Sequence, residues 1–246
     1  MLANPFRVME IAPNGAVLHG ASDNYAALAQ SRWRCHRERM MAIPSPRLLA
    51  ITDRRQAAQP LPDLAARLFA GGLRWLSLRE KDLDESRQVA LAHALVERAR
   101  PWGAVVTLHG DPDLALAAGT DGVHLPEGAD VAAARRRLGP GALVGLSTHD
   151  AEGIRRAAAG GADYVTLSPV FPSPSKPGYG PPIGTEALRR LAAESPLPII
   201  ALGGVESGTI GDCLAAGAAG VAVMGTAMRT PDRLPDLLKA LKGGQP

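Results

Sequence analysis

From Leu48 onward the chain alternates between short apolar runs rich in β-forming residues and longer alanine-rich segments with helical periodicity. Strands that alternate with helices pair in parallel, because each helix carries the chain back to the edge where the previous strand began. The eight apolar runs are residues 48–53, 75–80, 104–110, 122–126, 143–149, 164–170, 198–204 and 220–226. Eight such units predict one closed (β/α)8 TIM barrel, with a doubly wound open sheet as the alternative.

The intervening segments support the same fold. Helices are predicted at residues 61–70, 85–100, 130–138, 151–159 and 185–193. A short glycine-containing motif, here called the glycine phrase, recurs where a predicted helix is followed by the next strand, at residues 70–72, 118–123, 160–165 and 216–221. Glycine readily adopts the left-handed conformation that ends a helix, so the phrase predicts repeated βα units and says nothing of function.

Residues 1–46 differ from the rest of the chain. They lack a sustained hydrophobic period, contain a local arginine cluster (Arg32, Arg34, Arg37 and Arg39) and end in the stiff sequence Pro44-Ser45-Pro46. We therefore predict an irregular N-terminal extension, residues 1–46, followed by the barrel, residues 47–246.

Composition excludes several classes of protein. The net charge of +3 is spread along the chain, which argues against a nucleic-acid partner. No apolar run reaches the roughly 18 residues of a membrane helix. The two cysteines, Cys35 and Cys213, form no Cys-x-x-Cys pair. We expect a cytoplasmic enzyme with reduced thiols.

The active site of such a barrel lies at the carboxyl ends of its strands. Gly203-Gly204 and Met224-Gly225 end the last two predicted strands, and exposed backbone N–H groups there predict a phosphate-binding cradle. The alternative is that the glycines only permit tight turns. At the end of the second strand, alternation places Arg79 and Lys81 on one side and Glu80 on the other. Two cations there predict an anionic substrate; the alternative is a salt-bridged strand end.

Two further groups of polar residues fall at this face. The proline- and glycine-rich loop 169–180 contains Ser173, Ser175 and Lys176 and is predicted to be a lid. His109, His124 and His149 follow or end strands, where histidine is suited to acid–base catalysis. No ligand spacing predicts a zinc site.

Six segments, taken together and in order, resemble the thiamin phosphate synthase and TenI family over residues 48–240. They are ITDR at 51–54, LREK at 78–81, DGVHL at 121–125, GLSTH at 145–149, SPVFPSPSKP at 168–177 and ALGG at 201–204. The family contains a synthase, which joins a pyrimidine diphosphate to thiazole phosphate with Mg2+, and a tautomerase, which aromatises a thiazole phosphate by proton transfer. The resemblance also implies possible self-association.

For the synthase, the resemblance implies two sets of ligands. The diphosphate would contact Arg79, Lys81, Ser147 and Lys176. The thiazole phosphate would contact Ser173, Ser175, Gly204, Met224 and Gly225, beside Gly203 of the predicted cradle.

The sequence departs from the synthase pattern at the metal ligands. His109-Gly110 stands where the family has an Asn-Asp pair, and the loop after His124 is one residue shorter, so that Asp111 and Asp130 could substitute as metal ligands only by shifts out of register. We therefore favour a tautomerase that needs no cofactor and binds thiazole phosphate. Its catalytic residues would be His109, His124 and Lys81, with one histidine acting as an acid–base of near-neutral pKa. The alternatives are a Mg2+-dependent synthase, which would also bind the pyrimidine diphosphate, and a non-catalytic binder.

Overall fold

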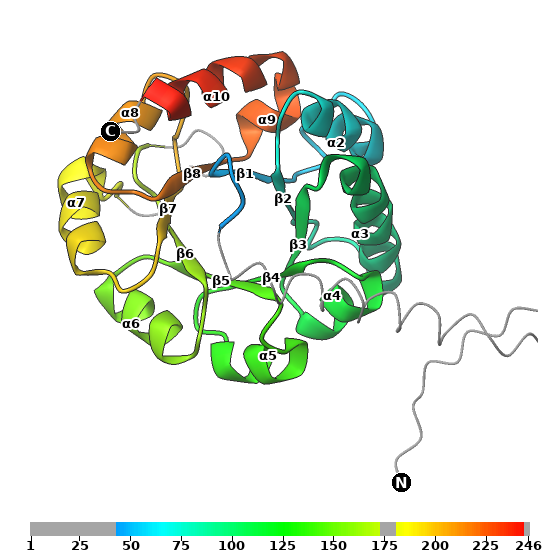
Figure 1. Ribbon diagram of the computed structural model, residues 1–246, viewed down its shortest axis with the longest axis horizontal. Helices are drawn as coiled ribbons and strands as arrows, with labels where there is room; N and C mark the ends of the chain where they lie inside the picture. The colour runs from blue at the N-terminus through cyan, green and yellow to red at the C-terminus, as the bar shows by residue number, and fades with distance from the viewer. Residues whose placement is uncertain (1–42, 173–180, 244–246) are drawn as a thin grey trace, which may run out of the picture. The chain divides into compact units, whose positions relative to one another are not determined.

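The computed structural model describes residues 43–172 and 181–243, which form a closed barrel of eight parallel strands in sequence order (Figure 1). The strands are β1 (Leu48–Ile51), β2 (Trp75–Leu78), β3 (Val105–His109), β4 (Gly122–Leu125), β5 (Leu143–Thr148), β6 (Tyr164–Leu167), β7 (Ile199–Ala201) and β8 (Gly220–Val223). Pairing of β1 with β8 closes the sheet, which confirms the predicted TIM barrel and excludes the open sheet.

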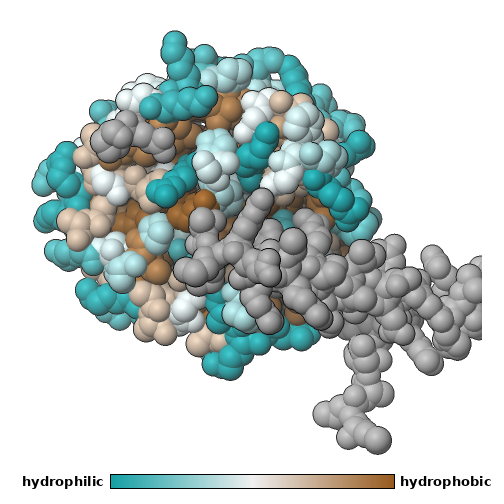
Figure 2. Space-filling view, in the orientation of Figure 1, coloured by the Kyte–Doolittle hydropathy of each residue, from teal (hydrophilic) through white to brown (hydrophobic). Residues whose placement is uncertain are grey.

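The helices form a ring outside the strands (Figure 1). They are α2 (Leu61–Ala70), α3 (Glu85–Ala99), α4 (Pro112–Ala118), α5 (Val131–Leu138), α6 (Ala151–Ala159), α7 (Gly184–Glu194), α8 (Ile210–Ala215), α9 (Gly225–Arg229) and α10 (Leu234–Gly243), with 3-10 turns η1 (Arg100–Trp102) and η2 (Pro231–Arg233). Hydrophilic side chains are spread around the periphery of the face in Figure 2, over these helices. The helices therefore bury apolar sides against the sheet, as their periodicity predicts.

The ends of the helices are fixed by local chemistry. Positive φ angles occur at Gly72, Gly119, Gly161 and Gly217, which confirms the predicted role of the glycine phrase. Four helices begin after an aspartate whose carboxylate accepts a hydrogen bond from a backbone N–H of the first turn. These N-cap residues are Asp84, Asp111, Asp130 and Asp150.

The strands end earlier than predicted, because the residues that follow them adopt conformations other than extended. β7 ends at Ala201, and Gly203 and Gly204 follow with φ angles of 95° and 64°, which extended strands do not adopt. These last residues form the loops at the mouth of the barrel, by which we mean the end at which the strands finish.

The barrel interior is filled mainly by aliphatic side chains, with Trp75 and Tyr164 in edge-to-face contact at 4.7 Å between ring centroids. Ile43 is buried in the same cluster, so at least one residue of the predicted extension belongs to the core of the barrel. Residues 1–42 lie outside the described residues. Within the described part of the chain, no helix is long and apolar enough to cross a membrane.

Candidate functional site

The end of β2 presents two cations at the mouth. Arg79 is half-buried and Lys81 is exposed, and neither side chain pairs with a carboxylate among residues 43–172 and 181–243. Partial burial, followed by the charge of Arg79, lowers the pKa of Lys81. Two neighbouring cations that repel each other favour the binding of an anion between them. The anionic substrate stays a prediction, which these two cations would suit.

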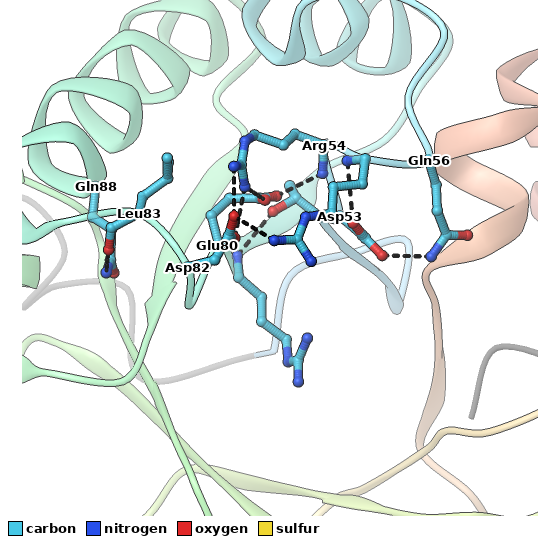
Figure 3. A network of polar contacts seen from close by, with 10 residues as sticks. Asp53, Arg54, Gln56, Glu80, Asp82, Leu83 and Gln88 are labelled. Carbon is cyan, nitrogen blue, oxygen red and sulfur yellow. Dashed lines mark hydrogen bonds and ion pairs between the residues drawn. The ribbon is translucent and has the colours of Figure 1, made fainter. Parts of the chain in front are cut away.

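The carboxylates beside these cations are occupied by arginines from the loop after β1 (Figure 3). Glu80 is buried and accepts hydrogen bonds from Arg54, at 2.9 Å from its backbone N and 3.0 Å from Nη1. Asp82 accepts from Nη1 and Nη2 of Arg54 at 2.7 and 2.6 Å, and from Arg55 at 2.8 Å. The end of β2 is therefore salt-bridged, as the alternative interpretation predicted. However, the cations of these salt bridges are Arg54 and Arg55, not Arg79 and Lys81. Arg79 and Lys81 stay available to a ligand.

Asp82 gives this network a testable pH dependence. Its hydrogen bonds to Arg54 hold the pKa of the carboxyl well below its usual value. A lowered folded-state pKa stabilises the protein above the unfolded pKa of about 4, and this contribution is lost as the pH falls towards the folded value. We expect Asp82→Asn to lower the free energy of unfolding at neutral pH and to match the wild type increasingly closely below about pH 4, as measured by urea unfolding. Glu206→Gln, an exposed carboxylate without an arginine partner among the described residues, is the control. A constant difference down to pH 2 (roughly the acid limit of the method) would contradict the assignment.

His124 lies inside the barrel rather than at the open mouth. Its Nδ1 is 3.0 Å from Oη of Tyr164, and its Nε2 is 3.0 Å from Oγ of Ser147 and 3.2 Å from Oγ1 of Thr166. Burial lowers the pKa of His124 to about 3, because the charged imidazolium would lose its hydration. The expectation of a near-neutral pKa is therefore wrong for His124. The structure does join His124 to Ser147, a predicted substrate ligand.

The two other histidines lie nearer the loops. His109 ends β3, is half-buried, and its ring centroid is 5.0 Å from that of His124. His149 follows β5, with Nδ1 at 2.6 Å from the backbone O of Ser168 and Nε2 at 3.5 Å from Glu127. Of the two histidines predicted to be catalytic, His109 is the one that remains a candidate for proton transfer.

The glycines after β7 have a structural reason to be glycines. A Cβ on Gly204 would lie 2.4 Å from the backbone O of Pro172, and one on Gly203 would lie 2.7 Å from Cα of Pro169. The backbone N of Phe171 also donates to the O of Gly203 at 2.9 Å. The loop after β6 approaches both glycines so closely that a side chain would not fit at either position. The glycines therefore have a structural role here, which was the alternative to a phosphate cradle, and the cradle itself stays a prediction.

The glycine after β8 is accompanied by a cation that the sequence did not reveal. Gly225 begins α9, and a Cβ there would lie 2.5 Å from Nη2 of Arg229, whose guanidinium also donates to Gln56. Met224 is half-buried beside it. The signal that could have identified Arg229 is its position four residues after Gly225. Ser173, Ser175 and Lys176 lie outside the described residues.

Asp111 and Asp130, the carboxylates that could substitute for the missing metal ligands, both lie at the starts of helices. Asp111 accepts from the backbone N of Asp113 at 2.6 Å, and Asp130 accepts from that of Ala133 at 2.8 Å. Each is thus engaged as a helix cap. Within residues 43–172 and 181–243, no group of three or more His, Cys, Asp or Glu side chains is placed to hold a metal ion. The residues present therefore do not fit a metal site built from protein ligands alone.

A closed barrel of eight parallel strands with helices outside it defines the (β/α)8 class, whose sites lie at the carboxyl ends of the strands, where Arg79 and Lys81 stand in this chain. A family profile described as thiamine monophosphate synthase matches residues 48–227, and the chain belongs to this family, which includes the TenI proteins.

The relatives bear similar names. The chain is 44% identical over 75% of its length to a Geobacter sulfurreducens protein named "Putative thiamine-phosphate synthase", covering 88% of that protein. It is 42% identical to a thiamine-phosphate synthase of Myxococcus xanthus, over 75% of this chain and 87% of the relative. Among solved structures, a thiamine phosphate pyrophosphorylase from Pyrococcus furiosus superposes with a TM-score of 0.72 at 26% identity, over 81% of this chain and 97% of that one. The protein thus belongs to a family of enzymes of thiamin biosynthesis.

Proposed function

We propose that this protein is a thiamin phosphate synthase, which joins a pyrimidine methyl diphosphate to a thiazole phosphate and releases diphosphate. The observation that carries the proposal is the pair of cations, Arg79 and Lys81, left without carboxylate partners in the described part of the chain. The names of the relatives support the same reaction. This reverses the preference for a tautomerase that the sequence suggested.

The cations suit the chemistry of diphosphate departure. When the bond to the diphosphate breaks, its electron pair moves to the leaving oxygen, where negative charge accumulates. Fixed positive groups at that position stabilise the transition state more than the ground state, which accelerates the reaction. Glu80 and Asp82 keep the backbone of this segment in place through Arg54, so that the two cations are held ready for the anion.

A direct assay tests the proposal. The purified full chain is mixed with the pyrimidine diphosphate and thiazole phosphate, and thiamin phosphate and free diphosphate are both quantified. We expect equal amounts of the two products. Because the described residues do not supply a metal site, the assay is run with Mg2+ and with a chelator. Absence of thiamin phosphate in both conditions would contradict the proposal.

A tautomerase remains the second candidate, and His109 favours it. This imidazole occupies the position of the missing metal-binding pair at the end of β3, on the same face as Arg79. Conversion of a thiazole carboxylate phosphate without pyrimidine diphosphate, lost in His109→Ala, would favour the tautomerase. Binding of thiazole phosphate with neither conversion would favour a non-catalytic binder.

A further inference from the structure

One row of inward-facing positions crosses four strands below the mouth. The strand register aligns His109 with His124, His124 with Gly145, and Gly145 with Tyr164. Gly145 has no side chain, so the phenol ring of Tyr164 fills the space over β5 and reaches His124. A Cβ on Gly145 would lie only 2.2 Å from Cζ of Tyr164. The contact between phenol and imidazole therefore depends on a glycine in the strand between them.

The next row towards the mouth holds two hydroxyl groups. Ser147 and Thr166 are paired in register on β5 and β6, and both hydroxyls face Nε2 of His124. Thr166 is fully buried, whereas Ser147 is half-buried near the end of its strand. Ser147 is therefore the member of this network closest to a ligand at the mouth.

The hydrogen-bond partners of His124 favour one tautomer. Burial raises the pKa of the Tyr164 phenol, so the phenol keeps its proton and can donate it. A phenol is a stronger acid, and so a better donor, than the aliphatic hydroxyls on the other side of the ring. If Tyr164 donates to Nδ1, the proton of the neutral imidazole must be on Nε2, where two hydroxyl oxygens can accept it. The other tautomer would offer one lone pair to two hydroxyl donors.

We propose that His124 is a positioning residue whose Nε2–H, fixed by Tyr164, turns the Ser147 hydroxyl towards an anion at the mouth. The chain of donors runs from Tyr164 Oη–H to Nδ1, from Nε2–H to Oγ of Ser147, and from Oγ–H to a phosphate oxygen. Each group donates once and no proton is transferred. The inference rests on the proposed function, because the anion in question is the diphosphate of the pyrimidine substrate.

The tautomer of His124 can be determined without an assay of enzyme activity. Long-range 1H–15N NMR of the full chain, with His124 assigned by comparison with His124→Gln, reports which ring nitrogen carries the proton. We expect a neutral ring protonated at Nε2 at neutral pH, and a mixture of tautomers in Tyr164→Phe. An Nδ1–H tautomer or an imidazolium in the wild type would overturn the proposal.

Diphosphate binding tests the orienting role itself. In calorimetric titrations with inorganic diphosphate, we expect Ser147→Ala to weaken binding by about tenfold, since a hydrogen bond to a charged group is lost. Tyr164→Phe should weaken binding about threefold in the wild-type background and not at all in Ser147→Ala, because both act through one hydroxyl. His124→Ala should resemble Ser147→Ala, whereas His124→Gln, which retains an amide N–H, should recover part of the affinity.

Thr148→Val is the matched control. Thr148 is the next residue on β5, is buried, and donates to the backbone O of Thr166 at 3.0 Å rather than to His124. This variant should lose stability but bind diphosphate as the wild type does. Equal weakening by Thr148→Val, additive effects of Tyr164→Phe and Ser147→Ala, or a wild type that binds no diphosphate would each overturn the role. If the variants bind diphosphate as expected but no thiamin phosphate forms, the proposed reaction is contradicted while the positioning role is supported.

Discussion

Replacement of Lys81 by alanine should lower the rate of thiamin phosphate formation by about 10²- to 10³-fold, the usual effect of removing one fixed group that stabilises transition-state charge. Lys81 and its neighbour Arg79 are the cations at the end of β2 that no described carboxylate neutralises. The loss should appear mainly in kcat, because the charge on the leaving diphosphate is greatest in the transition state. Steady-state kinetics of thiamin phosphate formation measure it.

The control for this experiment is Lys239→Ala. Lys239 is an exposed cation of α10, on the outer ring of helices, and should leave both kinetic constants unchanged. Lys81→Arg should keep part of the rate, since a guanidinium retains the charge but not the compact geometry of the ammonium group. A Lys81→Ala variant with near wild-type turnover would contradict the assignment of the β2 cations to the diphosphate.

Replacement of Gly145 by alanine should destabilise the barrel by about 3 kcal/mol, at the upper end of the usual cost of overpacking a core. The added methyl group would overlap the ring of Tyr164, which is fully buried and packed against Trp75. Both rings are fully buried in one apolar cluster, so a displacement of the Tyr164 ring would disturb the side chains packed around it. Urea unfolding, followed by tryptophan fluorescence, measures the loss.

Two variants separate overlap with Tyr164 from a general effect of replacing glycine. Gly208→Ala adds a methyl group where no heavy atom lies within 4 Å and should be nearly neutral. In a Tyr164→Leu background, where the ring is absent, Gly145→Ala should cost much less than in the wild type. Equal costs in both backgrounds would show that the phenol ring is not the obstacle.

Much of the fold follows from local pattern. The alternation of apolar runs with alanine-rich segments identified all eight strands, because each run is buried on both faces of the sheet and each helix has one apolar side. The strand ends were placed too late, as at Gly203 and Gly204. Apolarity and glycine content do not distinguish the last residue of a strand from the first residue of a packed loop.

The chemistry of single site residues was less predictable. The polar residues at strand ends were recognised from position alone, and Arg79, Lys81 and Ser147 do lie there. The lowered pKa of His124 does not follow from its position in the sequence, because its burial depends on neighbours such as Tyr164, which lies 40 positions away. The four-residue spacing of Gly225 and Arg229 brings their positions together only if the segment is helical, and the sequence does not predict a helix at residues 225–229.

The sequence by itself determined the closed barrel and the family, and it predicted an anion site at the carboxyl ends of the strands. Those conclusions depend on periodicity and on short motifs, which are properties of neighbouring residues. Only the tertiary structure decided which charges remain available. Arg54 crosses from the loop after β1 to neutralise Glu80 and Asp82, and so leaves Arg79 and Lys81 for a ligand. Electrostatic partners act through space, and the sequence does not show which side chain reaches a given charge first.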